Sequence, residues 1–231
     1  MIIEIKHRSS EFDSYRANRV KSLFNAESGS KWCHTAEIPI EDMEWQIGLI
    51  VGSSGSGKSS IGRQFFGLDK IINLYDGWDH NKPIIDCIDP LGSFDSVTGA
   101  LANVGLGDVP AWLRPFSALS NGQQFRAGLA RLIMDAPDQV VVDEFTSVVD
   151  RQIAKIGAMA FAKGWRRTTG KKVVLLSPHY DIIEWLQPDW VYNTDSGIVK
   201  KKAILESGQQ SNLTFSRSKE LTGDFLKSIT I

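Results

Sequence analysis

The sequence predicts an α/β fold with a mostly parallel central sheet, from two observations. The first is a set of short apolar runs with the length and composition of buried strands. These runs are residues 46–51, 84–88, 139–142 and 173–176. The second is the helical pattern between them, in which Phe125, Leu129, Leu132 and Ile133 are spaced for one face of a helix. Strands that alternate with helices are typical of a largely parallel sheet.

The composition is that of an ordinary globular protein. The chain has 231 residues, of which 42% are hydrophobic and 23% charged, and its formal net charge is -1. That charge gives no overall attraction to nucleic acid. Because no repeat or long linker interrupts the chain, we expect one domain over residues 1–231, with a helical insert at about 89–135 and a polar tail at about 198–231. Polar turn residues around 25–30 predict an N-terminal antiparallel β region.

Cysteine usage and hydropathy point to the cytoplasm. Cys33 and Cys87 are too few for a disulfide framework and lack the paired spacing of a zinc site. The first apolar residues run straight into the charged Glu4 and Lys6, unlike a signal peptide. No apolar run approaches the roughly 20 residues of a membrane span. We therefore expect no direct membrane insertion, so that a transporter would need separate membrane subunits.

A phosphate-binding loop follows the first of these runs. Residues 52–59 read GSSGSGKS and fit the pattern G-x-x-x-x-G-K-[ST], directly after the apolar residues 47–51. Glycines let the backbone wrap around phosphate oxygens, so that successive N–H groups and the next helix face the negative charge. Lys58 is expected to reach the β- and γ-phosphates, and Ser59 to offer its hydroxyl to Mg²⁺. The residues expected to bind nucleotide here are Gly52, Ser53, Ser54, Gly55, Ser56, Gly57, Lys58, Ser59 and Ser60.

Two acids end a later apolar run. Asp143 and Glu144 follow Val140, Val141 and Val142. At that position Asp143 could hold Mg²⁺ through water, and Glu144 could polarise an attacking water molecule. Acids at strand ends also serve as helix caps or turn residues, so this pair indicates a catalytic site only in combination with the phosphate loop.

A Ser/Gly turn opens the amphipathic helix near residue 125. Residues 119–123 read LSNGQ, and Ser120 with Gln123 fits a capping box, which is a purely structural role. The segment also resembles the signature L-S-G-G-Q of ABC-type nucleotide-binding domains, with Asn121 in place of the first glycine. The resemblance implies a P-loop NTPase of the ABC type that works as a head-to-tail homodimer on ATP with Mg²⁺. In it Ser120, Gly122 and Gln123 would meet the γ-phosphate held by the other copy, as the anion-binding tendency of a helix N-terminus allows.

The order of the motifs extends the resemblance to about residues 20–193. Residues 146–150 resemble the D-loop of the family, which implies that Asp150 reaches across the dimer. His179 follows the strand at 173–176 and occupies the position of the switch histidine. The stretches 143–151 and 179–190 further resemble a small group of soluble ABC ATPases found with acetyltransferase domains, including in phage genomes. An acetyltransferase is therefore one expected client.

The pattern departs from the family in three respects. The family has a glutamine after the strand that follows the P-loop helix, but no glutamine lies between Gln64 and Gln123 in this chain. Asp86 or Asp89 could serve instead, and Asp89 is a candidate Mg²⁺ ligand. Only 62 positions separate Lys58 from Ser120, which leaves a small helical insert. The aromatic residue that stacks on adenine lies before the P-loop, where both Phe24 and Trp32 qualify, while core packing would also explain either.

Three uses of such an ATPase remain open. It could be a soluble switch acting on a protein or nucleic-acid partner, the ATPase subunit of a membrane transporter, or a regulatory module with little turnover. The missing glutamine and short insert count against the second, and Glu144 counts against the third. A basic stretch could touch nucleic acid phosphates, although such stretches are often solvated helix ends. It comprises Lys163, Arg166, Arg167, Lys171 and Lys172.

Overall fold

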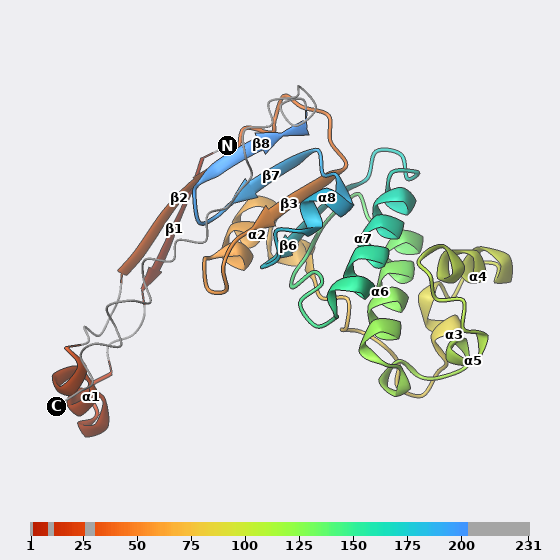
Figure 1. Cartoon of the computed structure of the whole chain (residues 1–231), viewed down its shortest axis with the longest axis horizontal. Helices are drawn as coiled ribbons and strands as arrows, with labels where there is room; N and C mark the ends of the chain where they lie inside the picture. The colour runs from red at the N-terminus through yellow and green to blue at the C-terminus, as the bar shows by residue number, and fades with distance from the viewer. Residues whose placement is uncertain (1, 9–11, 26–30, 203–231) are drawn as a thin grey trace.

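The centre of the protein is a six-stranded, mostly parallel sheet. The computed structural model describes residues 2–8, 12–25 and 31–202. The strand order is β4-β5-β6-β3-β7-β8, and every neighbouring pair is parallel except β7 with β8 (Figure 1). The strands are β3 (Ile47–Val51), β4 (Ile71–Ile72), β5 (Gln139–Val142), β6 (Lys172–Ser177), β7 (Trp190–Asn193) and β8 (Ile198–Lys201). The predicted parallel sheet is confirmed, and β4, β7 and β8 are strands that the sequence analysis did not identify.

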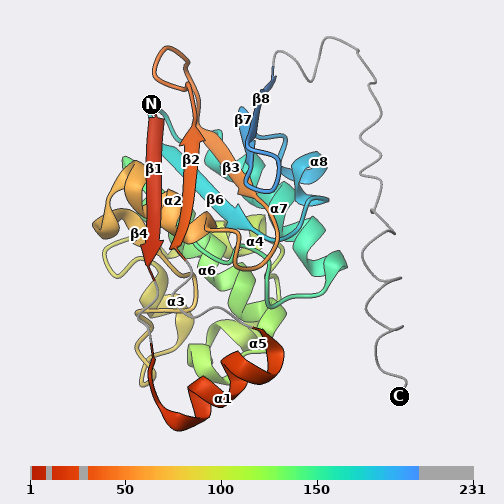
Figure 2. The ribbon, with the colours of Figure 1, turned by 90° about the vertical axis from the view of Figure 1, so that its left-hand side faces the viewer.

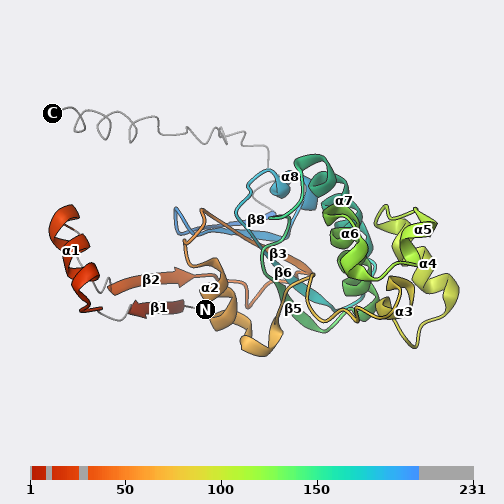
Figure 3. The ribbon, with the colours of Figure 1, turned by 90° about the horizontal axis from the view of Figure 1, so that it is seen from below.

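Helices cover both faces of this sheet. Successive residues of a strand point to opposite faces, and the apolar residues divide into two clusters accordingly. One face, with Leu49 and Leu175, packs against α6 (Asn121–Asp135), α7 (Arg151–Trp165) and α8 (Ile182–Leu186). The other face packs against α2 (Lys58–Phe66), which lies below the sheet in Figure 3 while α7 and α8 lie above it. Strands buried on both faces explain why they read as unbroken apolar runs.

The N-terminal region forms a separate antiparallel pair. Strand β1 (Ile2–Arg8) pairs with β2 (Lys31–Glu37) along its whole length, and α1 (Tyr15–Phe24) lies between them in the chain. Figures 1 and 2 show the two strands side by side, with α1 at the end that points away from the sheet. The predicted N-terminal antiparallel β region is therefore confirmed.

A group of helices lies between β4 and β5 in the chain. Its members are α3 (Ile84–Ile88), α4 (Phe94–Asn103), α5 (Val109–Trp112), the 3-10 turn η2 (Phe116–Ala118) and α6, while a 3-10 turn, η1 (Leu68–Lys70), precedes β4. Helices α3, α4 and α5 lie on the far side of α6 from the sheet (Figure 1). The prediction of a strand at 84–88 is wrong, because this segment is α3. It begins after Pro83, which is its N-cap residue, and it buries Ile84 and Ile88, four residues apart, as one face of a helix requires.

Within the described residues, no helix combines the length and the apolarity that crossing a bilayer demands.

The glycine at position 48 gives a direct test of the core. In the buried strand β3, a Cβ atom on Gly48 would clash with the ring of Trp190, which itself packs edge-on against Trp45 at 5.4 Å. We expect Gly48→Ala to lower the free energy of unfolding by about 1–3 kcal/mol, since overpacking a close-packed core forces its neighbours to move. Urea denaturation measures this. Gly99→Ala is the matched control: Gly99 lies inside α4 with no atom within 4 Å of the added Cβ, so its substitution should be neutral or stabilising.

Candidate functional site

The phosphate loop begins where the central strand ends. Strand β3 stops at Val51, and the chain turns through Gly52 and Gly57, whose φ angles of 155° and 88° suit glycine, before α2 starts at Lys58. Gly57 is the N-cap of α2, so the N–H groups of its first turn face the loop. Lys58 Nζ donates hydrogen bonds to the carbonyl oxygens of Gly52 at 2.9 Å and Ser53 at 2.7 Å, which folds the ammonium group over the loop.

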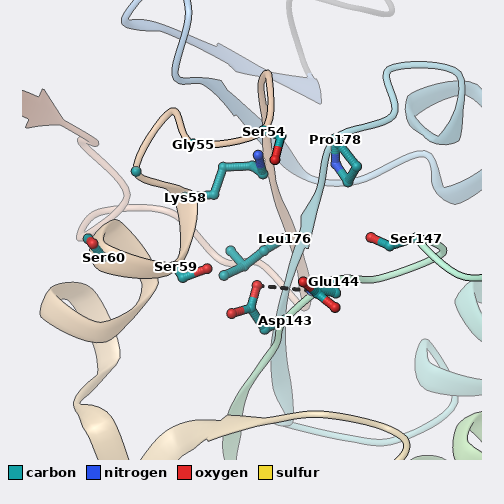
Figure 4. A pocket seen from close by; sticks show the side chains of 11 residues that line it. Ser54, Gly55, Lys58, Ser59, Ser60, Asp143, Glu144, Ser147, Leu176 and Pro178 are labelled. Carbon is teal, nitrogen blue, oxygen red and sulfur yellow. Dashed lines mark hydrogen bonds between the residues drawn. The ribbon is translucent and has the colours of Figure 1, made fainter. Parts of the chain in front are cut away.

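A cavity of about 660 Å³ opens over this loop. Figure 4 shows the Ser59 hydroxyl and the Asp143 carboxylate on facing sides of it, with Glu144 beside Asp143. The structure thus brings together the phosphate loop and the pair of acids, which are more than 80 residues apart in the chain. The lining residues are Ser54, Gly55, Gly57, Lys58, Ser59, Ser60, Asp143, Glu144, Ser147, Leu176 and Pro178.

The two acids are held by the backbone around β5. The N–H of Asp143 donates to the carbonyl of Ile72 at 3.0 Å, and the N–H of Glu144 donates to Asp143 Oδ1 at 2.9 Å. Glu144 has a φ of 54°, an unusual value for a residue other than glycine, and its side chain is exposed to the cavity. Burial, and then the charge of Glu144, raise the pKa of Tyr75 to about 12, so this phenol keeps its proton.

His179 lies two residues after the end of β6, next to the lining residue Pro178. Its N–H donates to Ser177 Oγ at 3.2 Å, and its side chain is partly buried. Burial lowers the pKa of His179, the positive charge of Arg151 lowers it further, and Asp181 opposes both. Arg151 and Asp181 themselves form a two-pronged ion pair, with Nε to Oδ2 at 2.9 Å. The net downward shift of the pKa favours the neutral imidazole.

The turn at Ser120 is a well-formed helix start. Ser120 is the N-cap of α6, and its capping box with Gln123 is complete. A Cβ atom on Gly122 would meet the side chain of Ile153, so this glycine allows α6 to approach α7. None of these residues lines the cavity of the same chain. The structural role of the capping box is confirmed.

Other predicted site residues lie elsewhere. Asp150 caps α7, accepting from the N–H groups of Gln152 and Ile153 at 2.9 Å. Phe24 ends α1 and is 75% exposed, away from the cavity, so nothing in this structure supports stacking on adenine. Trp32 lies in β2 opposite His7, and its side chain is outside the described residues. The Asp89 carboxylate accepts the N–H of Leu91 at 3.1 Å after α3 and does not line the cavity.

Asn73 is a residue that the sequence analysis missed. Because 84–88 is a helix, the strand that follows the P-loop helix is β4, which pairs with β5 beside Asp143. Asn73 is the first residue after β4, and its Oδ1 accepts the N–H of Tyr75 at 3.0 Å. A side-chain amide therefore stands where the family resemblance implies a glutamine.

Solved ABC structures share this arrangement. The chain superposes on the dimeric structure of MJ0796, a bacterial ABC transporter cassette, with a TM-score of 0.53 at 16% identity, over 70% of this chain and 88% of that one. It superposes equally well, at 17% identity, on a bacterial Atm1-family ABC exporter with ATP bound, over 77% of this chain and 36% of that one. The chain has the mixed α/β fold, with a mostly parallel sheet, of these ABC cassette structures. The predicted fold class is confirmed.

Several curated relatives of the chain are named as ATP-binding proteins of transporters. It is 26% identical to the oligopeptide transport ATP-binding protein OppF of Lactococcus lactis, over 67% of this chain and 60% of that protein. It is 32% identical to the energy-coupling factor transporter ATP-binding protein EcfA1 of Levilactobacillus brevis, and 31% identical to the methionine import ATP-binding protein MetN of Rhizobium johnstonii. These matches cover 47% and 54% of this chain and 37% and 32% of the relatives. No protein-family model matches the chain.

Ion pairs partly neutralise the basic stretch at residues 163–172. Arg166 pairs with Asp189 at 3.1 Å, and Lys171 pairs with Asp138 at 2.7 Å. Both pairs lie near the start of the parallel strands, at the end of the sheet opposite the phosphate loop. The structure therefore adds no support to a nucleic-acid surface at this stretch.

The effect of Arg151 on the pKa of His179 can be tested by removing this positive neighbour. In Arg151→Met we expect the midpoint of His179 titration to rise, because the nearby positive charge is lost and Asp181, which favours the protonated imidazole, is left without its partner. NMR titration of the imidazole protons measures the midpoint in both proteins. Lys155→Met, on an exposed part of the same helix, is the control and should leave the midpoint unchanged. A midpoint that stays put in Arg151→Met would contradict the electrostatic explanation.

Proposed function

We propose that this protein is an ATPase, which binds MgATP at the phosphate loop and hydrolyses it to ADP and phosphate between two head-to-tail copies. The observation that carries the proposal is that Lys58, Ser59, Asp143 and Glu144 line the same cavity. It combines an anion-binding loop, two oxygen donors for a cation and an exposed carboxylate for water. The relatives named as ATP-binding proteins support it, although the chain spans only 32–60% of the lengths of the three described above.

The residues around the cavity fit Mg²⁺. Ser59 and Asp143 offer the hydroxyl and carboxylate oxygens that this hard cation prefers. Among the described residues, no group of three or more acids, histidines or cysteines could hold a metal by itself. The remaining ligands would be water and phosphate oxygens, which is usual for magnesium with nucleotides. Bound there, the ion would neutralise charge on the phosphates.

Each side chain has a physical task in this proposal. The N–H groups from Ser54 to Ser60 and the Lys58 ammonium hold phosphate oxygens. Glu144 orients and polarises the attacking water, and general-base help of this kind is typically worth about 10²- to 10⁴-fold in rate. Neutral His179 can donate or accept a hydrogen bond near the γ-phosphate. The turn with Ser120, Gly122 and Gln123, and also Asp150, would come from the second copy.

Removal of the Glu144 charge tests hydrolysis and dimerisation together. We expect Glu144→Gln to keep its affinity for MgATP, lose at least about 100-fold in turnover, and accumulate as a dimer, because binding energy closes the interface while the water is no longer activated. Phosphate release and light scattering after size exclusion measure the two effects. Ser120→Ala in the same background should return the protein to monomer. A Glu144→Gln protein that stays monomeric with ATP while turning over normally would refute the assignment.

Two kinds of client for this ATPase, a membrane subunit and a soluble partner, are each favoured by an observation. The relatives are named as ATP-binding proteins of oligopeptide transport, of methionine import and of an energy-coupling factor transporter, which favours service to a separate membrane subunit over a soluble role. The lack of a glutamine after β4 and the small helical group favour the second client, a soluble protein such as an acetyltransferase, or nucleic acid. We place the transporter role first, because sequence similarity supports it directly.

The trapped dimer separates these clients. If the protein serves a transporter, tagged Glu144→Gln with ATP should sediment with membrane vesicles and enrich a multi-span membrane protein, because the closed state is the one that holds its partner. Mass spectrometry of both fractions identifies what is bound. The Lys58→Ala protein, which should not bind ATP, is the control. Enrichment of a soluble acetyltransferase alone, or salt-dependent enrichment of nucleic acid, would overturn the transporter role.

A further inference from the structure

The turn between β7 and β8 is packed directly against the phosphate loop. The N–H of Thr194 donates to the carbonyl of Val51 at 2.8 Å, and Thr194 Oγ1 donates to the same oxygen at 3.2 Å. Thr194 Oγ1 also lies 2.6 Å from the hydroxyl of Ser56, within the loop. The Thr194 hydroxyl occupies the space that a Cβ on Gly52 would fill. A buried residue of a distant turn thus touches the loop at its first and fifth positions.

The carboxylate of the next residue in the turn, Asp195, is hydrogen-bonded to Ser53, the second residue of the loop. The N–H of Ser53 donates to both carboxylate oxygens, at 3.2 Å and 3.0 Å, and Ser53 Oγ donates to Oδ1 at 2.8 Å. Ser53 does not line the cavity, so these donors serve the loop's shape and not the space above it. A carboxylate that accepts several hydrogen bonds is a strong local tie, because such bonds are stronger than those between neutral groups.

The same carboxylate also reaches the segment that carries His179. The hydroxyl of Tyr180 donates to Asp195 Oδ2 at 2.6 Å and contacts Asn193 Oδ1 at 3.4 Å. Burial raises the pKa of Asp195, but the hydrogen bonds from Tyr180 and Ser53 outweigh burial and the net shift is downward, which keeps the group charged. Asp195 therefore joins two segments that are more than 120 residues apart, one before Lys58 and one directly after His179.

We infer that Asp195 is a positioning residue, which sets the phosphate loop through Ser53 and couples it to the His179 segment through Tyr180. This inference rests on the proposed binding of MgATP. Its physical content is preorganisation: a loop already held in its binding shape loses less conformational freedom when the phosphates arrive. Asp195 does not line the cavity, so we place its action in its hydrogen bonds with Ser53 and Tyr180.

A double-mutant cycle tests this role. We expect Asp195→Ala to raise the dissociation constant for MgATP about fivefold, and Tyr180→Phe about threefold, since part of each lost hydrogen bond is replaced by water at this exposed carboxylate. In the double variant, Tyr180→Phe should add little, because its hydroxyl has already lost the Asp195 acceptor. Isothermal titration calorimetry gives the constants, and thermal unfolding shows that each variant is folded. Ser196→Ala, whose hydroxyl accepts the N–H of Ile198 within the same turn, is the control and should bind as the wild type does.

The results distinguish a failure of the proposed function from a failure of the role inferred for Asp195. Wild-type protein that fails to bind MgATP overturns the proposed function and this inference with it. Wild-type protein that binds, with Asp195→Ala binding equally well, overturns the inference alone. Effects of the two substitutions that simply add would overturn the coupling, because independent sites add and a shared hydrogen-bonded group does not. If Asp195→Ala does not fold, Asp195→Asn replaces it in the same cycle, with the same expected direction.

Discussion

The site depends on one constraint, the double pairing of β3. This strand is hydrogen-bonded to β6 on one side and β7 on the other, and all five of its residues are buried. All three strands run in the same direction, so their carboxyl ends meet at one edge of the sheet. The phosphate loop, the His179 segment and the Thr194–Asp195 turn follow these ends directly. Neighbouring loops can then exchange hydrogen bonds although they are far apart in sequence.

The sequence predicted those parts of the site that a local pattern specifies. The glycine spacing of the phosphate loop and the apolar run before it require no knowledge of tertiary structure, and the structure places both as expected. The two acids after β5 were recognisable because the strand before them is wholly apolar. Each of these features is specified by a sequence pattern of about ten residues, so local chemistry determines its structure.

Other parts could not be predicted because tertiary contacts decide them. A five-residue apolar run fits either a strand or one buried helix face, and residues 84–88 became helical against α6. Strand β4 has only two residues and no signal of its own, so the glutamine position was sought too late in the chain and Asn73 was missed. Phe24 was chosen by its position before the phosphate loop, but it belongs to a helix that buries no side chain. Asp195 lies in a turn whose importance only its partners reveal.

The residues of the signature turn show why one structural explanation does not exclude a functional one. Ser120 and Gln123 complete a capping box, and Gly122 permits close packing against Ile153, so all three would be explained in an isolated chain. A capped helix start is also where unpaired N–H groups and the helix dipole favour an anion. The cap makes the turn rigid and fixes the direction of those groups. This turn does not line the cavity of its own chain, so under the proposed function it would act in the cavity of a second copy, and hydrolysis would depend on dimerisation.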